Sequence, residues 1–168
     1  MRTNSKIGVF PGTFDPVTFG HIDLIKRAAG IFDKVIVAVA HHSSDKRSLF
    51  TVDERKVLLS QAVKGLRHVT IDDFSGLVVD YAREKGARVM IRGTRMLSDF
   101  EYEFQMALTN RKLAEDIETI FLMPHEPFST ISSRMVREIA VLGGDLSKFV
   151  PSYVAAALKA KIAKDRRS

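Results

Sequence analysis

Short apolar runs alternate with longer helical patterns along the whole chain, and this alternation most constrains its fold. The runs are rich in valine and isoleucine, and most are apolar on both faces, as the strands of a parallel sheet covered on both sides must be. Five strands are expected, at Lys6–Phe10, Val35–Ala40, His68–Asp72, Val89–Arg92 and Thr119–Met123. Repeated βα units with right-handed crossovers predict an α/β fold, namely a single-domain, doubly wound, Rossmann-like five-stranded parallel sheet with helices on both faces.

Helix-start signals lie between these runs. Thr51-Val-Asp-Glu54 and Ser98-Asp-Phe-Glu101 both match the capping box and each predict the start of a helix. Ser75 is expected to cap a third helix that Gly86 closes in a left-handed conformation. Further helices are expected after His21, after Ser132–Ser133, and at about residues 151–165 with Pro151 in the first turn.

Length and composition limit the class of protein. The chain has 168 residues, and we expect one domain over residues 1–168. The absence of cysteine excludes disulfides and thiolate metal sites and fits a reducing cytoplasm. We expect neither a leader segment nor a membrane span, because no run approaches about 18 apolar residues. The net charge of +6 predicts an anionic partner, either a nucleic-acid polymer or a small phosphorylated molecule.

Residues 9–24, VFPGTFDPVTFGHIDL, lead from the first strand through a Gly/Pro turn to a helix. With the strand ending at Phe10, the turn lies at the carboxyl edge of the sheet, where doubly wound folds bind ligands. Gly12 allows close backbone approach, Thr13 offers a hydroxyl and an N–H, and His21, in the first turn of the helix, can donate from its ring. These groups suit a nucleotide phosphate, but they equally fit a plain tight turn with a surface histidine. The usual phosphate loops are excluded, because neither Gly-x-Gly-x-x-Gly nor a Walker lysine is present.

Other candidate residues follow the later strands. Arg92 and Arg95, three residues apart at a strand end, fit a bidentate phosphate clamp as well as a plain surface position. Glu103 suits a ligand contact or an early helical turn, where acidic residues are favoured. The charged loop that holds Lys46 would ordinarily be a solvated connection. Residues 128–134 place hydroxyl side chains before a helix, where they bind phosphates or cap the helix.

Four motifs in register give the chain a specific resemblance. Thr18-Phe-Gly-His21 is similar to the T/H-x-G-H signature of the nucleotidyltransferase superfamily, and with PGTFDP before it resembles the bacterial phosphopantetheine adenylyltransferases. The other motifs, HHSSDKRSLFTVDER (41–55), IRGTRMLSDFEYE (91–103) and FLMPHEPFSTISSRMVRE (121–138), extend the match over essentially the whole chain. The resemblance implies an enzyme that transfers AMP from ATP to 4′-phosphopantetheine, giving dephospho-coenzyme A and pyrophosphate in coenzyme A biosynthesis.

The same resemblance implies roles for individual residues. The expected catalytic residues are Lys46, Arg95 and His21, with His21 stabilising the transition state at the α-phosphate. The expected ATP-binding residues are Thr13, Phe14, His21, Gly93, Thr94, Arg95, Glu103, Phe128, Ser129, Thr130, Ile131, Ser132, Ser133 and Arg134. The expected phosphopantetheine-binding residues are Thr13, Lys46, Val78 and Arg92.

Two of these assignments stay open. Arg47 stands beside Lys46, and the sequence does not choose between the two cations. Arg134 occupies a position where some members of the family have a third small hydroxyl residue, so it either contacts pyrophosphate or faces water.

The implied chemistry agrees with the residues. The acceptor phosphate is already anionic, so its in-line attack on the α-phosphorus needs no general base, and catalysis comes from positioning and charge neutralisation. Mg²⁺ is implied as the cofactor and is expected to be held mainly by the ATP phosphates, without a dedicated metal site in the protein. The resemblance also implies a homohexamer, with no nucleic-acid polymer or membrane as partner.

Two alternatives remain. One is another nucleotidyltransferase of the superfamily, such as a nicotinamide-mononucleotide adenylyltransferase, against which the stretch LVVDYAREKGARVMIRGTRMLSDFEYE argues. The other is a non-catalytic basic module that binds nucleic acid. That module would need stacking aromatic residues among its cations, whereas the chain has no tryptophan and three tyrosines.

Overall fold

The computed structural model describes residues 5–41, 48–95 and 97–165. Its centre is a parallel sheet of five strands in the order β3-β2-β1-β4-β5. The strands are β1 (Ile7–Gly12), β2 (Lys34–Ala40), β3 (Val69–Phe74), β4 (Val89–Gly93) and β5 (Glu118–Leu122). The order reverses beside β1, because the chain winds from β1 to β3 on one side and then crosses to β4 and β5 on the other. The predicted doubly wound fold is therefore confirmed.

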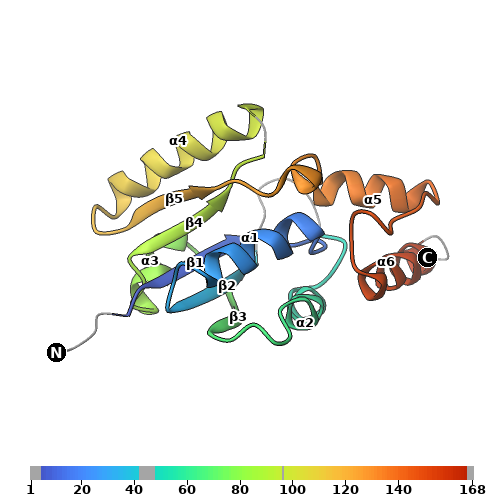
Figure 1. Cartoon of the computed structure of the whole chain (residues 1–168), viewed down its shortest axis with the longest axis horizontal. Coiled ribbons are helices and arrows are strands. Elements are labelled where there is room, and N and C mark those ends of the chain that lie inside the picture. Colours follow the sequence, from blue (N-terminus) through green and yellow to red (C-terminus); the bar gives the residue numbers. More distant parts are fainter. Residues whose placement is uncertain (1–4, 42–47, 96, 166–168) are drawn as a thin grey trace.

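Helices cover both faces of this sheet (Figure 1). They are α1 (Phe19–Ala29), α2 (Val52–Ala62), α3 (Val78–Glu84), α4 (Leu97–Leu113), the short 3₁₀ helix η1 (Glu126–Phe128), α5 (Ser133–Val141) and α6 (Ser152–Asp165). One core packs α1, α2, α5 and α6 against side chains such as Phe10, Val37 and Ile91. The second core packs α3 and the segment after α4, with Ala114 and Ile117, against the opposite face, around Val9, Ile36 and Met90.

Several predicted boundaries are wrong by a residue or two. Strand β1 continues through Pro11 to Gly12, pairing there with β2 alone, because its pairing with β4 ends at Val9. A proline, which has no N–H to donate, is tolerated where one side of the strand has lost its partner. Helix α6 begins at Ser152, and the Pro151 carbonyl accepts its first hydrogen bonds.

Of three predicted helix-start signals, the structure confirms one. The capping box of Thr51 and Glu54 is confirmed at α2. Ser75 does not cap α3, because Leu77 precedes that helix and gives no side-chain cap, whereas Gly86 has the expected positive φ of 68°. Helix α4 begins at Leu97, so Ser98 lies inside the helix and not before it, as was predicted.

Candidate active site

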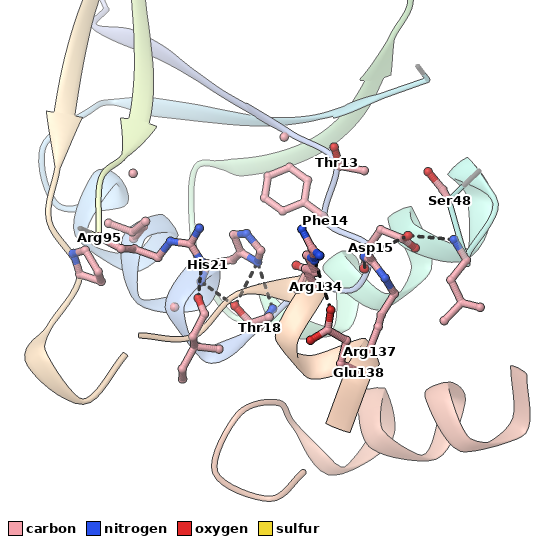
Figure 2. Close-up of a pocket in the computed structure, with 18 of the residues that line it drawn as sticks. Thr13, Phe14, Asp15, Thr18, His21, Ser48, Arg95, Arg134, Arg137 and Glu138 are labelled. Carbon is pink, nitrogen blue, oxygen red and sulfur yellow. Dashed lines mark hydrogen bonds and ion pairs between the residues drawn. The ribbon is translucent and has the colours of Figure 1, made fainter. Parts of the chain in front are cut away.

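A cavity of about 1660 Å³ opens at the carboxyl edge of the sheet (Figure 2). Its wall combines the β1–α1 turn, the first turns of α1, the end of β4, and helix α5. This is the edge at which the winding order reverses, so the fold gathers these segments where doubly wound proteins bind ligands.

The β1–α1 turn brings its backbone close to the cavity. Phe14 has a φ of 50°, which a residue with a side chain rarely adopts. A Cβ atom added at Gly12 would lie 2.9 Å from the Phe14 ring, so only glycine leaves that ring in place. The Phe14 ring in turn meets the imidazole of His21 edge to face, with 5.0 Å between the ring centroids.

His21 is the third residue of α1, so the prediction that this helix follows His21 is wrong, and the prediction that His21 lies in its first turn is confirmed. Thr18 caps the helix, and its side chain accepts a hydrogen bond from the His21 N–H. The Thr18 N–H donates to Nδ1 of His21 over 3.1 Å. This is a capping box in which histidine takes the place of the usual Glu or Gln.

These contacts fix the protonation state of the imidazole. Because Nδ1 accepts from a backbone N–H, the neutral ring carries its proton on Nε2. Burial and, secondarily, the nearby charge of Arg95 lower the pKa of His21 to about 4. At neutral pH, His21 therefore offers an uncharged Nε2–H donor to the cavity.

Arg95 and Arg92 reach the site from the end of β4. Arg95 lines the cavity, and its Nη1 donates to the carbonyl of Ile131 over 2.6 Å. Arg92 makes a bidentate pair with Glu103, at 2.6 Å from Nε and 2.5 Å from Nη2, and also donates to the carbonyl of Pro11 over 3.1 Å. The predicted acceptor-binding arginine and ATP-binding carboxylate are thus direct partners.

The hydroxyl groups of Ser129, Ser132 and Ser133, before and at the start of α5, are hydrogen-bonded to backbone groups. The Ser129 hydroxyl donates to the carbonyl of Glu126, and the Ser132 side chain caps α5 by accepting from Met135. Ser133 lines the cavity while its hydroxyl donates to the carbonyl of Pro16 over 2.7 Å.

Helix α5 adds two arginines to the wall of the cavity. Arg134 is largely exposed and lies 3.2 Å from the Glu138 carboxylate, one turn further along the helix. Arg137 donates to the backbone carbonyl of Asp15 and lies 3.4 Å from its carboxylate. The two arginines, with Arg95 and His21, place N–H donors around one hollow (Figure 2). This arrangement suits a polyanion.

A second, smaller cavity of about 220 Å³ adjoins the first. It is lined by apolar groups including Phe74, Val78 and Met106, and it shares Thr13 and the Arg92–Glu103 pair with the larger cavity. Val78, predicted to line the arm of phosphopantetheine, therefore lies in a different hollow from His21, separated from it by a wall with a charged pair.

Most predicted site residues are brought together. The large cavity is lined by Thr13, Phe14, His21, Arg92, Gly93, Arg95, Glu103, Ile131, Ser133 and Arg134. Thr94 is buried behind this wall, with its N–H bonded to Leu122, and Phe128 packs on Phe19. Ser129, Thr130 and Ser132 lie in the same loop but outside the wall of the cavity. Lys46 and Arg47 fall outside the described residues.

Three residues without a role in the sequence reasoning support this site. Arg55, although 2% exposed, donates to the carbonyls of Thr13 and Ala40 over 2.7 and 3.0 Å. Asp15 accepts from two backbone N–H groups, those of Leu49 and Phe50. Arg137 stands three residues after Arg134, a helical spacing that could have drawn attention to it.

Within the described ranges, no group of three or more histidine, aspartate or glutamate side chains is arranged to hold a metal ion. Over the same ranges, no helix combines the length and the apolar character needed to cross a lipid bilayer.

Comparison with known proteins shows the relationship. A family model described as cytidylyltransferase-like matches residues 9–139. The chain is 52% identical to the phosphopantetheine adenylyltransferase of Caldanaerobacter subterraneus subsp. tengcongensis, over 95% of this chain and 99% of that protein. It is 54% identical to the enzyme of the same name from Desulforudis audaxviator, over 93% of this chain and 95% of that protein.

Solved structures share the fold at lower identity. A putative nicotinate-nucleotide adenylyltransferase from Vibrio parahaemolyticus gives a TM-score of 0.69 at 20% identity, covering 92% of this chain and 98% of that chain. The nicotinic acid mononucleotide adenylyltransferase of Plasmodium falciparum, complexed with NaAD, gives a TM-score of 0.68 at 12% identity, covering 94% of this chain and 95% of that chain. These similarities concern the fold, whereas the identity of about half over nearly the whole chain shows the family. The chain belongs to the phosphopantetheine adenylyltransferases, within the cytidylyltransferase-like nucleotidyltransferases.

Proposed function

We propose that the chain transfers AMP from ATP to 4′-phosphopantetheine, releasing pyrophosphate and forming dephospho-coenzyme A. The observation that carries this proposal is a neutral Nε2–H donor on His21 in a cavity that four arginines line, in a chain about half identical to enzymes of that name. In the reaction, an oxygen of the acceptor phosphate forms a bond to the α-phosphorus, and the bond from the α-phosphorus to the bridging oxygen breaks. The electron pair leaves with pyrophosphate.

His21 acts at the centre of this transfer. The neutral imidazole of His21 already carries a proton on Nε2 at neutral pH. Its Nε2–H can therefore donate a hydrogen bond to the negatively charged α-phosphate without transferring the proton. Its orientation is fixed beforehand by Thr18, so little reorganisation is needed as the transition state forms. Arg95 and Arg134 line the same cavity, and in this proposal they neutralise the departing pyrophosphate.

The second cavity supplies a place for the other substrate. The pantetheine arm is long and partly apolar, which suits the hollow that contains Val78 and Met106. Its phosphate would then reach the shared wall at Thr13 and Arg92, with Lys46 as a further phosphate ligand. Because Arg92 and Glu103 are paired, the phosphate meets an arginine whose orientation is already set.

Magnesium enters this proposal with the nucleotide. The carboxylates on the wall, Asp15, Glu103 and Glu138, each accept from N–H donors of the chain. The triphosphate itself supplies most of the oxygen ligands that Mg²⁺ needs, so MgATP is the proposed substrate.

We also propose that the enzyme is a cytoplasmic homohexamer, as the resemblance implies. Support comes from helix α4, on which Phe100, Phe104 and Leu108 are spaced four residues apart, so that they share one side of the helix, and are exposed at 41%, 47% and 44%. A contiguous apolar surface of this kind marks a contact between protein chains.

The experiment that tests the function measures pyrophosphate release by the purified chain. With MgATP, phosphopantetheine should support turnover, and nicotinamide mononucleotide should not. The His21→Ala variant should lower kcat about 100- to 1000-fold with a much smaller change in the KM for ATP, because the interaction is strongest in the transition state. Release of pyrophosphate with nicotinamide mononucleotide and none with phosphopantetheine would overturn the proposal.

A further inference from the structure

His125 ties the segment between β5 and α5 to the helix that carries His21. Its ring Nδ1 lies 2.5 Å from Oδ1 of Asp23, and its backbone N–H donates to Oδ2 of the same carboxylate over 2.9 Å. Asp23 lies in α1, two residues after His21, and its side chain is 11% exposed. Both oxygens of a largely buried carboxylate are thus used by one residue that is distant in sequence.

Arg27 orients the imidazole from the other side. Its Nη1 lies 3.4 Å from Nε2 of His125, and because a guanidinium can only donate, Nε2 accepts. The ring proton therefore stays on Nδ1, where it is donated to Asp23. Partial burial acts to raise the pKa of Asp23. The hydrogen bonds from the backbone N–H and the ring of His125 have the larger combined effect, so the pKa of Asp23 lies below its usual value.

The anchored segment contributes to the proposed nucleotide site. Pro124, the residue before His125, lines the large cavity. Past His125, the ring of Phe128 lies 6.1 Å from the ring of Phe19, and a Cβ added at Gly20 would come within 3.4 Å of the Phe128 carbonyl. Further along, the carbonyl of Ile131 accepts from Arg95. The first turns of α1 and residues 124–131 are therefore packed as one unit.

We propose that His125 is a positioning residue for ATP, which acts through Asp23 to hold residues 124–131 at a fixed place relative to His21. This inference rests on the proposed function, because it concerns the same nucleotide site. His125 itself does not line the cavity, so its effect on ATP passes through the backbone that it anchors.

Steady-state kinetics of three single variants test the inference. His125→Ala removes the ring donor, and we expect the KM for ATP to rise about tenfold while kcat and the KM for phosphopantetheine change less than about twofold. His125→Asn should restore most of the ATP affinity, because the Asn amide can place an N–H where Nδ1–H stood. The matched control is Asp116→Asn, which removes an exposed carboxylate partner of Arg83 before β5, and its kinetic constants should equal those of the wild type.

A double variant separates positioning from general stability. If His125 acts through Asp23, the KM for ATP of Asp23→Ala/His125→Ala should not exceed that of Asp23→Ala alone. A lower melting temperature with an unchanged KM for ATP, or an equal rise in the KM of both substrates, would overturn the inference. Titration calorimetry of MgATP binding to the wild type and to His125→Ala compares their ATP affinities without turnover. A wild type without activity would refute the proposed function, and the calorimetry would still test the role of His125.

Discussion

At the scale of single residues, the two ring nitrogens of His21 have different tasks. Nδ1 accepts from the Thr18 N–H and completes the start of α1, which leaves Nε2–H for the ligand. The residue that completes the capping box of α1 is therefore also the residue that we propose to contact the phosphate. A substitution at His21 would remove the capping-box hydrogen bond together with the proposed transition-state contact, and the two losses are measured by different experiments.

The lowered pKa of His21 gives a prediction for stability. The pKa is about 4 in the folded chain and about 6.5 when unfolded, so between these values the unfolded state binds more protons. The contribution of neutral His21 to stability is fully present above pH 6.5 and is lost as the pH falls towards 4. The free energy of unfolding, measured by urea denaturation of the ligand-free chain, should fall more between pH 7.5 and pH 5 for the wild type than for His21→Gln. Equal losses would contradict the lowered pKa.

At the scale of elements, Arg55 joins helix α2 to the carboxyl ends of two strands. Its guanidinium donates to the carbonyls of Thr13, just after β1, and Ala40, the last residue of β2. Burial lowers the pKa of Arg55, and the nearby charge of Asp15 opposes this effect. One buried cation thus holds together the backbone behind the proposed phosphate site.

Removing this cation should destabilise the fold. Arg55→Met keeps much of the apolar volume but leaves two partly buried carbonyls without their donor, at a cost of about 2–4 kcal/mol in the free energy of unfolding. Arg67→Met, at an exposed position after α2, is the matched control and should change the free energy of unfolding by less than about 0.5 kcal/mol. Urea denaturation at neutral pH measures both. An Arg55→Met chain as stable as the wild type would show that the two carbonyls find other donors.

Local patterns in the sequence predict the strands of this fold, but they do not predict the contacts between residues far apart in the chain. Runs such as Val35–Ala40 were predicted because a strand buried on both faces leaves few polar positions. The start of α1 was misplaced because its capping box uses His21, which the usual Thr-x-x-Glu pattern does not include. The tie between Asp23 and His125 spans 102 positions, and that between Asp15 and Arg137 spans 122. No local pattern contains such contacts, because only the finished fold brings these side chains together.

At the scale of the whole molecule, the exposed apolar side of α4 predicts association. The proposed hexamer should have six times the 18.8 kDa mass of one chain when measured by light scattering after gel filtration. Phe104→Glu places a charge on this surface and should lower the measured mass. Val57→Glu, at a site on α2 that is 57% exposed, is the matched control and should not. A wild-type mass of one chain would refute the proposed assembly.

The wall between the two cavities has a consequence for the design of ligands. Thr13, Arg92 and Glu103 line both hollows, so the hollows are separated by little more than one layer of side chains. A compound that places an adenylyl group in one and an amide-containing tail in the other loses its freedom of translation and rotation once, whereas two separate molecules lose it twice. A short linker across the Arg92–Glu103 pair should therefore turn two weak fragments into one tight inhibitor.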